Sequence, residues 1–418
     1  MSDKKKYFIT YWDGIPFEYY SEERMVEAIE CGFNLIQGGK VGGYKEDKPQ
    51  HMSYDVPTSQ KALEVSEKYG VKYMVFDIRM KNLVESNPTD EEIDETVRAV
   101  CEDFKNYSAL HSYLVKDEPD VSYFPRLRKI VDAFHKYDPD HPPYINLLPN
   151  YAPASMHGCP TYEEYVEQFI EAVHPDILCY DHYHLTQTNR PQDALLNVNS
   201  EFEAQVYSAS LNRSEREGFY ENLEIIRRQG LKNNIPYMLI VLLVEHGPYR
   251  YLTRAELYFE VWQTLAYGCS TLSYYNYWAL PACRNYKNAI ISHDGKKCQH
   301  YWDVKEINKN IEAIGNCIVN TKSEAVFHVG GKNEKEGVVP FEPHMGIDNI
   351  TGGDLTVGFF EDKTVVIANK DFDNPADVTL KTDRALEIFD VESERFVPLE
   401  SKQLKINAGE GVYLKIAE

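Results

Sequence analysis

The segment YLVKDEPD, residues 113–120, joins a short apolar run to two adjacent carboxylates and a proline. The run at 113–115 is typical of a buried strand, and Asp117-Glu118-Pro119 ends it abruptly. A helical pattern follows at 122–136, where apolar residues recur on one face. The segment therefore predicts one strand-plus-helix unit that carries acids at the carboxyl end of its strand.

The same unit recurs between residues 7 and 318. Apolar runs predict strands at 7–12, 34–37, 72–77, 113–116, 144–148, 176–181, 236–244 and 271–278. Helical patterns follow them at 22–31, 58–69, 90–107, 122–136, 161–173, 213–229, 253–267 and 299–318. Eight such units predict an α/β fold, the closed (β/α)8 or TIM barrel. An open doubly wound sheet is the alternative, but its first turn is usually glycine-rich, and WDGIPFE at 12–18 is not.

The pattern changes near residue 322. GDLTVGFFEDKTVVIANKDFDNPADVTLKT, at 353–382, alternates apolar and polar residues with turn residues between them, which is typical of antiparallel strands. We therefore expect a barrel domain at 1–322 and a small C-terminal antiparallel β-sandwich at 323–418. The sandwich is expected to be an appendage rather than the place of chemistry.

Composition narrows the range of partners. The 418 residues carry a net charge of −22, which argues against nucleic acid and anionic membranes and disfavours strongly anionic substrates. The longest apolar run, at 237–244, is too short to cross a bilayer. The first residues, MSDKKKYFITYWDG, lack the apolar core of an export signal. We expect a cytoplasmic protein, or a periplasmic or secreted one if a signal has been trimmed; the oligomeric state stays open.

Acids and aromatic residues recur where the predicted strands end, and in a barrel the reactive groups lie at these carboxyl ends. The strand ends carry Trp12, Asp13, Asp77, Asp117, Glu118, Tyr180, Asp181, His182, Tyr183, His184, Glu245, His246, Tyr275 and Trp278. Aromatic rings stack on the C–H faces of sugars, while carboxylates bind hydroxyls and transfer protons. The mixture predicts a carbohydrate substrate.

Two glutamates stand out among these residues. Glu118 follows the fourth predicted strand and Glu245 follows the seventh, and these strands lie across the mouth of a barrel from each other. Hydrolysis of a glycosidic bond needs such a pair, one protonated and one ionised. Asp181 is the alternative second carboxylate. If it faces Glu118 across a water molecule, the enzyme would be an inverting one. Glu245 could instead be a rim residue paired with Arg250 or Arg254, and Asp117 a helix cap.

Asp117-Glu118-Pro119 resembles the Asn-Glu-Pro signature of glycoside hydrolase clan A, the TIM-barrel retaining glycosidases. The order of barrel and small β-domain is similar to family 42-like enzymes and to uncharacterised gut-bacterial relatives. The resemblance implies that Glu118 is the acid/base and Glu245 the nucleophile. Asp117 replaces the asparagine that binds the sugar 2-hydroxyl, so it could accept a hydrogen bond there but not donate one.

The resemblance also implies an aromatic subsite. Tyr180 or Tyr183 would orient the nucleophile, and Trp278 would form the platform beneath the sugar. Contacts to the sugar hydroxyls are expected from Trp12, Asp117, Asn146 and Asp181. No metal or organic cofactor is required by this chemistry. The expectation is a glycosidase that cleaves a β-glycosidic bond of a neutral sugar or oligosaccharide with retention.

Two other functions stay open. His182 and His184 share one face of an extended segment, and His184 with Glu118 and Asp181 could bind a divalent ion in a metal-dependent sugar isomerase or epimerase. Alternatively, the barrel could bind carbohydrate through its aromatic rim without catalysis. The sequence does not fix the sugar, its linkage, or exo versus endo cutting.

Overall fold

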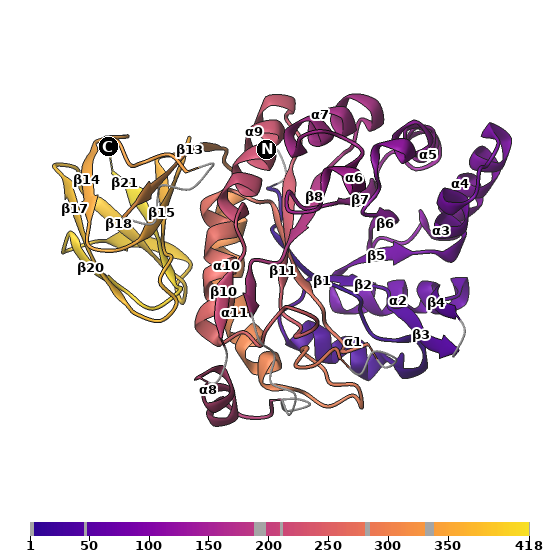
Figure 1. Cartoon of the computed structure of the whole chain (residues 1–418), viewed down its shortest axis with the longest axis horizontal. Helices are drawn as coiled ribbons and strands as arrows, with labels where there is room; N and C mark the ends of the chain where they lie inside the picture. The colour runs from indigo at the N-terminus through magenta and orange to yellow at the C-terminus, as the bar shows by residue number, and fades with distance from the viewer. Residues whose placement is uncertain are drawn as a thin grey trace.

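The computed structural model describes residues 4–45, 48–187, 198–209, 212–280, 285–330 and 338–417. Eight parallel strands pair in the order β1-β12-β11-β8-β7-β6-β5-β2, which confirms the (β/α)8 barrel (Figure 1). They are β1 (Phe8–Trp12), β2 (Leu35–Gln37), β5 (Lys72–Phe76), β6 (Leu110–Asp117), β7 (Pro143–Leu147), β8 (Leu178–His182), β11 (Tyr237–Leu242) and β12 (Thr271–Tyr275). Each lies within a few residues of its predicted position.

Asn34 joins β1 to β2, the two strands at the ends of that order. The Asn34 amide N–H donates to the Ile9 carbonyl at 3.2 Å. Its side-chain oxygen accepts from the Ile9 N–H at 2.9 Å. The Asn34 side chain thus makes a hydrogen bond that the backbone of a longer β2 strand would make with β1. This contact closes the barrel, and the carboxyl ends of all eight strands lie at one mouth.

Helices surround the barrel near their predicted positions: α1 (Glu22–Glu30), α2 (Val56–Tyr69), α4 (Asp90–Phe104), α5 (Phe124–Tyr137), α7 (Tyr162–Val173), α9 (Phe219–Asn233), α10 (Arg254–Ala266) and α11 (Gln299–Ile318). The helix predicted at 213–229 was wrong at its start, because residues 213–215 form a strand and α9 begins at Phe219. Side chains of Ser21, Thr89, Thr161 and Thr253 cap four of them by accepting a backbone N–H of the first turn. The connections hold further elements that the patterns did not predict: α3 (Ile78–Glu85), α6 (Ala154–His157), α8 (Glu201–Ala209), the hairpin of β3 (Lys40–Lys45) and β4 (Lys48–Ser53), and the pair β9 (Leu185–Gln187) and β10 (Arg213–Glu215).

Alternation along the strands decides which side chains face the inside of the barrel. The inner cluster contains Trp12, Leu35, Met74, Phe76, Leu114, Tyr144, Cys179, Met238 and Ile240. The residues between them in sequence pack outward against the helices.

The C-terminal strands form two antiparallel sheets around a second apolar core, which confirms the β-sandwich. One sheet holds β13 (Ser323–Val329), β15 (Leu355–Phe360), β16 (Thr364–Asn369), β21 (Gly411–Ile416), β18 (Leu386–Asp390) and β19 (Arg395–Pro398). The other holds β14 (Ile347–Thr351), β17 (Ala376–Thr382) and β20 (Gln403–Ile406). The division into independent domains after residue 322 stays a prediction.

The sandwich packs directly on α10, beside which it lies in Figure 1. Two glycines allow this approach: a Cβ on Gly358 would lie 1.9 Å from the Ala266 carbonyl oxygen, and one on Gly411 would lie 2.5 Å from the Trp262 ring. With barrel strands on one side and the sandwich on the other, every residue of α10 from 256 to 266 is buried.

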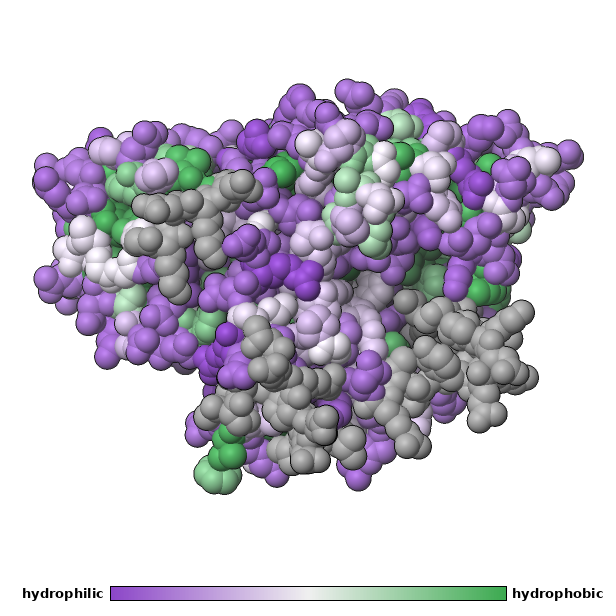
Figure 2. Space-filling view, viewed as in Figure 1, coloured by the Kyte–Doolittle hydropathy of each residue, from purple (hydrophilic) through white to green (hydrophobic). Residues whose placement is uncertain are grey.

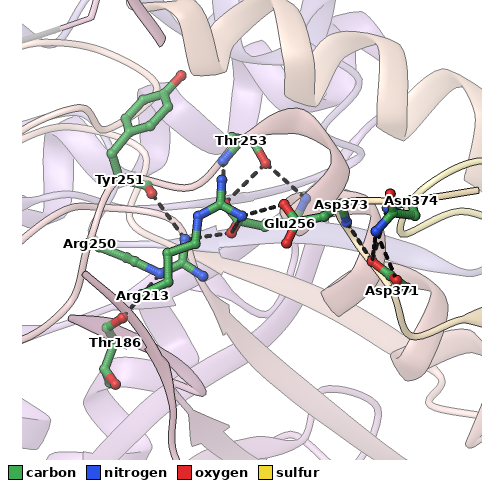
Figure 3. Close-up of polar contacts among 9 residues, drawn as sticks. All are labelled: Thr186, Arg213, Arg250, Tyr251, Thr253, Glu256, Asp371, Asp373 and Asn374. Carbon is green, nitrogen blue, oxygen red and sulfur yellow. Dashed lines mark hydrogen bonds and ion pairs between the residues drawn. The ribbon is translucent and has the colours of Figure 1, made fainter. Parts of the chain in front are cut away.

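A buried ion pair lies at the same junction (Figure 3). Arg250 Nη1 is 2.6 Å from Glu256 Oε1, and neither side chain is accessible to solvent. Arg213, in β10, lies 3.7 Å from the same carboxylate and pairs with Asp373 of the sandwich. Arg250 Nε also donates to the Thr186 carbonyl at 3.1 Å. The Glu256 carboxylate therefore links Arg250, in the segment after β11, to Arg213 in β10. Arg213 in turn links this pair to Asp373 of the sandwich.

Hydrophilic residues predominate on the face shown in Figure 2, in keeping with the net charge of −22. Within the described residues, no helix combines the length and the apolar character needed to cross a membrane.

Candidate active site

A cavity of about 180 Å³ lies at the carboxyl-end mouth of the barrel. Residues at or beyond the ends of six strands contribute to it, as in the active sites of this fold. They are Trp12, Asp13, Asp117, Glu118, Asn146, Asp181, Tyr183, Ile240, His246 and Tyr275. Four carboxyl groups, three tryptophan or tyrosine side chains and one histidine therefore share one small space.

Asp181 and Glu118 meet in this cavity in different environments. The Asp181 side chain is 3% exposed, whereas Glu118 is exposed. Burial, and then the negative charge of Glu118, raise the pKa of Asp181 well above its usual range. A buried carboxyl that holds its proton beside a solvated carboxyl is the arrangement of an acid and a base.

Asn146 orients this group of acids from the neighbouring strand. Its Nδ2 donates to Asp181 Oδ1 at 2.9 Å and to Asp117 Oδ1 at 3.1 Å. Its Oδ1 accepts from the Cys179 thiol at 3.1 Å, and Cys179 Sγ lies 2.7 Å from Tyr144 Oη. Because both ends of the amide are engaged, its orientation is fixed and Asp181 has one preferred direction.

The backbone turns sharply at two of the acids. Asp13 has a φ of 50° and Glu118 a φ of 46°, the left-handed region that side chains other than glycine seldom adopt. In a regular strand, neighbours point to opposite faces. The turns break this alternation, so that both Trp12 and Asp13, and both Asp117 and Glu118, reach the cavity.

Aromatic rings form one wall of the cavity. The Tyr183 and Tyr275 rings stack with centroids 5.3 Å apart, and the His246 ring lies 5.6 Å from Tyr275. Burial, followed by the charge of Asp13, raises the pKa of Tyr275, so its hydroxyl stays protonated. Such a wall offers flat apolar faces to the C–H groups of a sugar ring.

Six of the predicted site residues lie together in the cavity: Trp12, Asp117, Glu118, Asn146, Asp181 and Tyr183. Glu245 is not among the lining residues. Strand β11 ends at Leu242, and the N–H groups of both Leu243 and Val244 donate to the Tyr275 carbonyl, so the alternation of the strand is interrupted before Glu245. The Glu245 side chain is fully buried. Its carboxylate accepts from Tyr207 Oη at 2.7 Å and from Asn288 Nδ2 at 2.8 Å. The role of Glu245 as nucleophile stays a prediction.

Tyr180 and Trp278 are also absent from the cavity lining. Tyr180 faces outward into the core between the sheet and the helices, because it alternates with the inward Cys179 and Asp181. Trp278 is buried against Tyr19, with ring centroids 4.9 Å apart, and near the Arg24 guanidinium. Tyr275, His246 and Asp13, which were not among the predicted site residues, also line the cavity. Alternation counted from Asp181 would have assigned Tyr180 outward and Tyr183 inward.

His184 lies apart from Glu118 and Asp181. Its Nε2 is 3.3 Å from Glu215, and its ring stacks on Phe219 at 4.7 Å. In the part of the chain that the structure describes, no three His, Cys, Asp or Glu side chains are grouped so as to hold a metal ion. The ligand set of the isomerase alternative is therefore not assembled.

No protein-family model and no curated protein sequence matches this chain. Solved structures share its fold. A glycoside hydrolase aligns with a TM-score of 0.56 and 10% identity over 100% of this chain and 96% of its own. A glycoside hydrolase family 5 protein from Bacteroides vulgatus aligns with a TM-score of 0.55 and 10% identity over 99% of this chain and 89% of its own.

A cold-adapted β-galactosidase from Rahnella sp. R3 gives a TM-score of 0.51 and 10% identity over 78% of this chain. This chain spans 58% of the length of that β-galactosidase. At such identity the likeness shows a shared barrel fold of the kind that glycoside hydrolases use.

Proposed function

We propose that this chain is a glycoside hydrolase that uses Glu118 and Asp181 as its two carboxyl groups. The observation that carries the proposal is the buried Asp181 beside the exposed Glu118 in one cavity with an aromatic wall. Fold neighbours described as glycoside hydrolases add support from outside the chain.

The environments of the two carboxyls assign their roles. Asp181, which holds a proton, donates it to the glycosidic oxygen as the bond to the anomeric carbon breaks. Glu118 attacks that carbon and forms a covalent glycosyl-enzyme. Asp181, now ionised, then takes a proton from water, and the water displaces Glu118. The retention predicted from the sequence is kept, with the role of acid/base moved from Glu118 to the buried Asp181.

The predicted substrate is a β-linked neutral sugar or oligosaccharide. An anionic sugar is disfavoured, because four carboxyl groups line the cavity. Tyr275 and Tyr183 supply the platform assigned from sequence to Trp278. Asn146 acts chiefly by holding Asp181 and Asp117, because both of its N–H groups are directed to them.

Glu245 is the competing second carboxylate. As the nucleophile it would have to reach the anomeric carbon from a fully buried position, where Tyr207 and Asn288 hold both carboxylate oxygens. We therefore propose that Glu245 anchors the segment after β11. Variants of Glu118, Asp181 and Glu245 distinguish Asp181 from Glu245 as the second catalytic carboxylate.

Hydrolysis of a panel of paired aryl α- and β-glycosides tests the function. We expect release of the aryl group from a β-glycoside and a first-formed sugar of unchanged anomeric configuration by proton NMR. Inversion would instead make Glu118 the base that activates water. Full activity of the Glu118→Gln variant on the best substrate would reject the proposal. Sugar binding without any cleavage would favour the non-catalytic carbohydrate-binding alternative.

A further inference from the structure

A hollow of about 270 Å³ adjoins the cavity, and Trp12 and Asp117 line both spaces. The cavity alone, at about 180 Å³, is smaller than the roughly 300–1,000 Å³ of small-molecule sites, whereas the two spaces together fall within that range. A ligand that occupied only the cavity would leave the adjoining hollow unused. The hollow therefore has the position and the size to receive a second part of the substrate.

An additional helix and an irregular strand end build the hollow. Helix α3, which lies between β5 and α4 in the chain, forms one wall of it. The pairing of β6 with β7 shifts register between Leu114 and Lys116, and residues 114–117 all line the hollow. Such β-bulges redirect side chains and recur beside active sites.

An ion pair holds the outer edge of the hollow in place. Lys116 Nζ lies 2.7 Å from Glu85 Oε1, and this contact joins the end of β6 to the end of α3. Tyr123 Oη donates to the second oxygen of Glu85 at 3.2 Å, and Lys116 Nζ lies 4.8 Å from the centre of the Tyr123 ring. The hollow is therefore preformed, and the opposite charges of Lys116 and Glu85 offset each other at its edge.

The inner lining of the hollow is apolar, whereas four carboxyl groups line the cavity. The hollow is lined by Phe76, Val84, Leu114 and Val115, which are at most 7% exposed and whose side chains have no hydrogen-bonding group. A second sugar against these residues would leave hydroxyl groups without partners, at a cost in free energy. An apolar ring would instead release water from them, which is favourable.

The hollow also lies close to the bond that the proposed function cleaves. Asn146 Nδ2 donates to Asp181 Oδ1 at 2.9 Å and to Asp117 Oδ1 at 3.1 Å, so the two carboxyl groups flank one nitrogen atom. Asp181 is the proposed proton donor to the glycosidic oxygen, and Asp117 lines the hollow. A leaving group joined to that oxygen is therefore within reach of the hollow.

We propose that the substrate is an aryl glycoside, a sugar joined to a phenol, and that the hollow binds the aromatic leaving group. The inference rests on the proposed function and replaces the oligosaccharide there by a sugar with one apolar ring. As the bond between the anomeric carbon and the glycosidic oxygen breaks, the Asp181 proton passes to that oxygen and the phenol leaves. Water then supplies a hydroxyl to the anomeric carbon and a proton to Asp181.

Binding titrations of the full chain with β-thioglycosides, which resist hydrolysis, test this inference. The probes are the phenyl, methyl and glucosyl β-thioglycosides of glucose, galactose and mannose. We expect at least one phenyl compound to bind about tenfold or more tightly than its methyl and glucosyl counterparts.

Variants of the wall of the hollow locate the phenyl group. Val84→Phe, which narrows the hollow, should reduce the phenyl preference to within about twofold. Val84→Ile adds a single methylene, is the milder change if Val84→Phe does not fold, and should reduce the preference about threefold. Val397→Phe, at a 38% exposed position in β19 of the sandwich, is the control and should leave the preference unchanged.

Equal binding of the phenyl and methyl compounds, tighter binding of the glucosyl compound, or binding of none would overturn the inference. So would a phenyl preference that is unchanged in the folded Val84 variants. The outcome is separable from that of the proposed function. Hydrolysis of glycosides without a phenyl preference would reject only the aromatic leaving group. A phenyl preference that depends on Val84, without hydrolysis of any aryl glycoside, would reject only the glycosidase.

Discussion

Asn146 Nδ2 lies 2.9 Å from Asp181 Oδ1, and neither side chain is more than 3% exposed. The contact favours the ionised form of Asp181 and so lowers its pKa, against burial and the charge of Glu118, which raise it. Asn146 therefore limits how firmly Asp181 holds its proton. The fraction of Asp181 that carries a proton at a given pH depends on this balance.

Removal of the Asn146 amide should move the alkaline limb of the pH–rate profile. In Asn146→Leu the pKa of Asp181 loses the contact that lowers it, so the limb should shift to higher pH while kcat falls about 10- to 100-fold from misorientation. Steady-state kinetics from pH 4 to 10 measure both effects. Tyr144→Phe removes the hydroxyl that contacts Cys179, which in turn donates to Asn146, and should shift the limb less. An unshifted limb in Asn146→Leu would contradict the assigned acid.

The folded protein should lose stability with rising pH through Asp181. A carboxyl whose pKa is raised by folding contributes stability that is fully present below the unfolded value of about 3.9 and is lost as pH rises through the folded pKa. The side chain introduced by Asp181→Asn cannot ionise, so the variant does not lose this stability. The Tm of the variant minus the Tm of wild type should therefore be larger at pH 8 than at pH 4. Thermal melts at pH 4 and pH 8 give the comparison, and a constant difference in Tm would speak against a raised pKa.

The buried pair of Arg250 and Glu256 should tolerate joint replacement better than the loss of one partner. Arg250→Met leaves the buried Glu256 carboxylate with the more distant Arg213, at 3.7 Å, as its cationic neighbour, and should lower the free energy of unfolding by about 3 kcal/mol. The double variant Arg250→Met/Glu256→Leu should recover much of that loss. Lys129→Met, in the exposed pair with Asp90, is the control and should cost at most about 1 kcal/mol. Denaturant unfolding measures all three; additive losses would contradict the coupling.

Close packing of the sandwich on α10 predicts a strong effect at Gly358. A Cβ there would lie 1.9 Å from the Ala266 carbonyl oxygen, a backbone atom that cannot move aside alone, so Gly358→Ala should destabilise by about 3 kcal/mol or more. Gly70→Ala meets no atom within 4 Å and should cost about 1 kcal/mol, for its positive φ alone. Calorimetry separates them, and equal Tm values would argue against the tight junction.

The barrel could be predicted because every strand-plus-helix unit carries its own periodic signal. The helix at 299–318, for example, was predicted from its apolar spacing and is observed at Gln299–Ile318. The sandwich was likewise readable from its alternation. The elements that were missed, such as α8 and the β9–β10 pair, lie in long connections whose structure depends on tertiary contacts rather than on local pattern.

The site was predictable only in part, for a physical reason. A strand buried on both faces is apolar throughout, so YMLIVL at 237–242 does not reveal which alternate residues face inward. Glu245 was therefore assigned to the mouth by its place after a strand, whereas the backbone leaves regular pairing at Leu243 and Val244, whose N–H groups both donate to the Tyr275 carbonyl. Asp13 and Glu118 reach the cavity through positive-φ turns, which sequence does not show at residues other than glycine.

The central claim is that Asp181, and not Glu245, works with Glu118. Its most direct test is kcat/KM of Glu118→Gln, Asp181→Asn and Glu245→Gln on the best aryl glycoside found. The account predicts losses of about 10³-fold or more for the first two and about tenfold or less for Glu245→Gln, with all three folded by circular dichroism. A loss of about 10³-fold in Glu245→Gln, with near wild-type activity in Asp181→Asn, would contradict it.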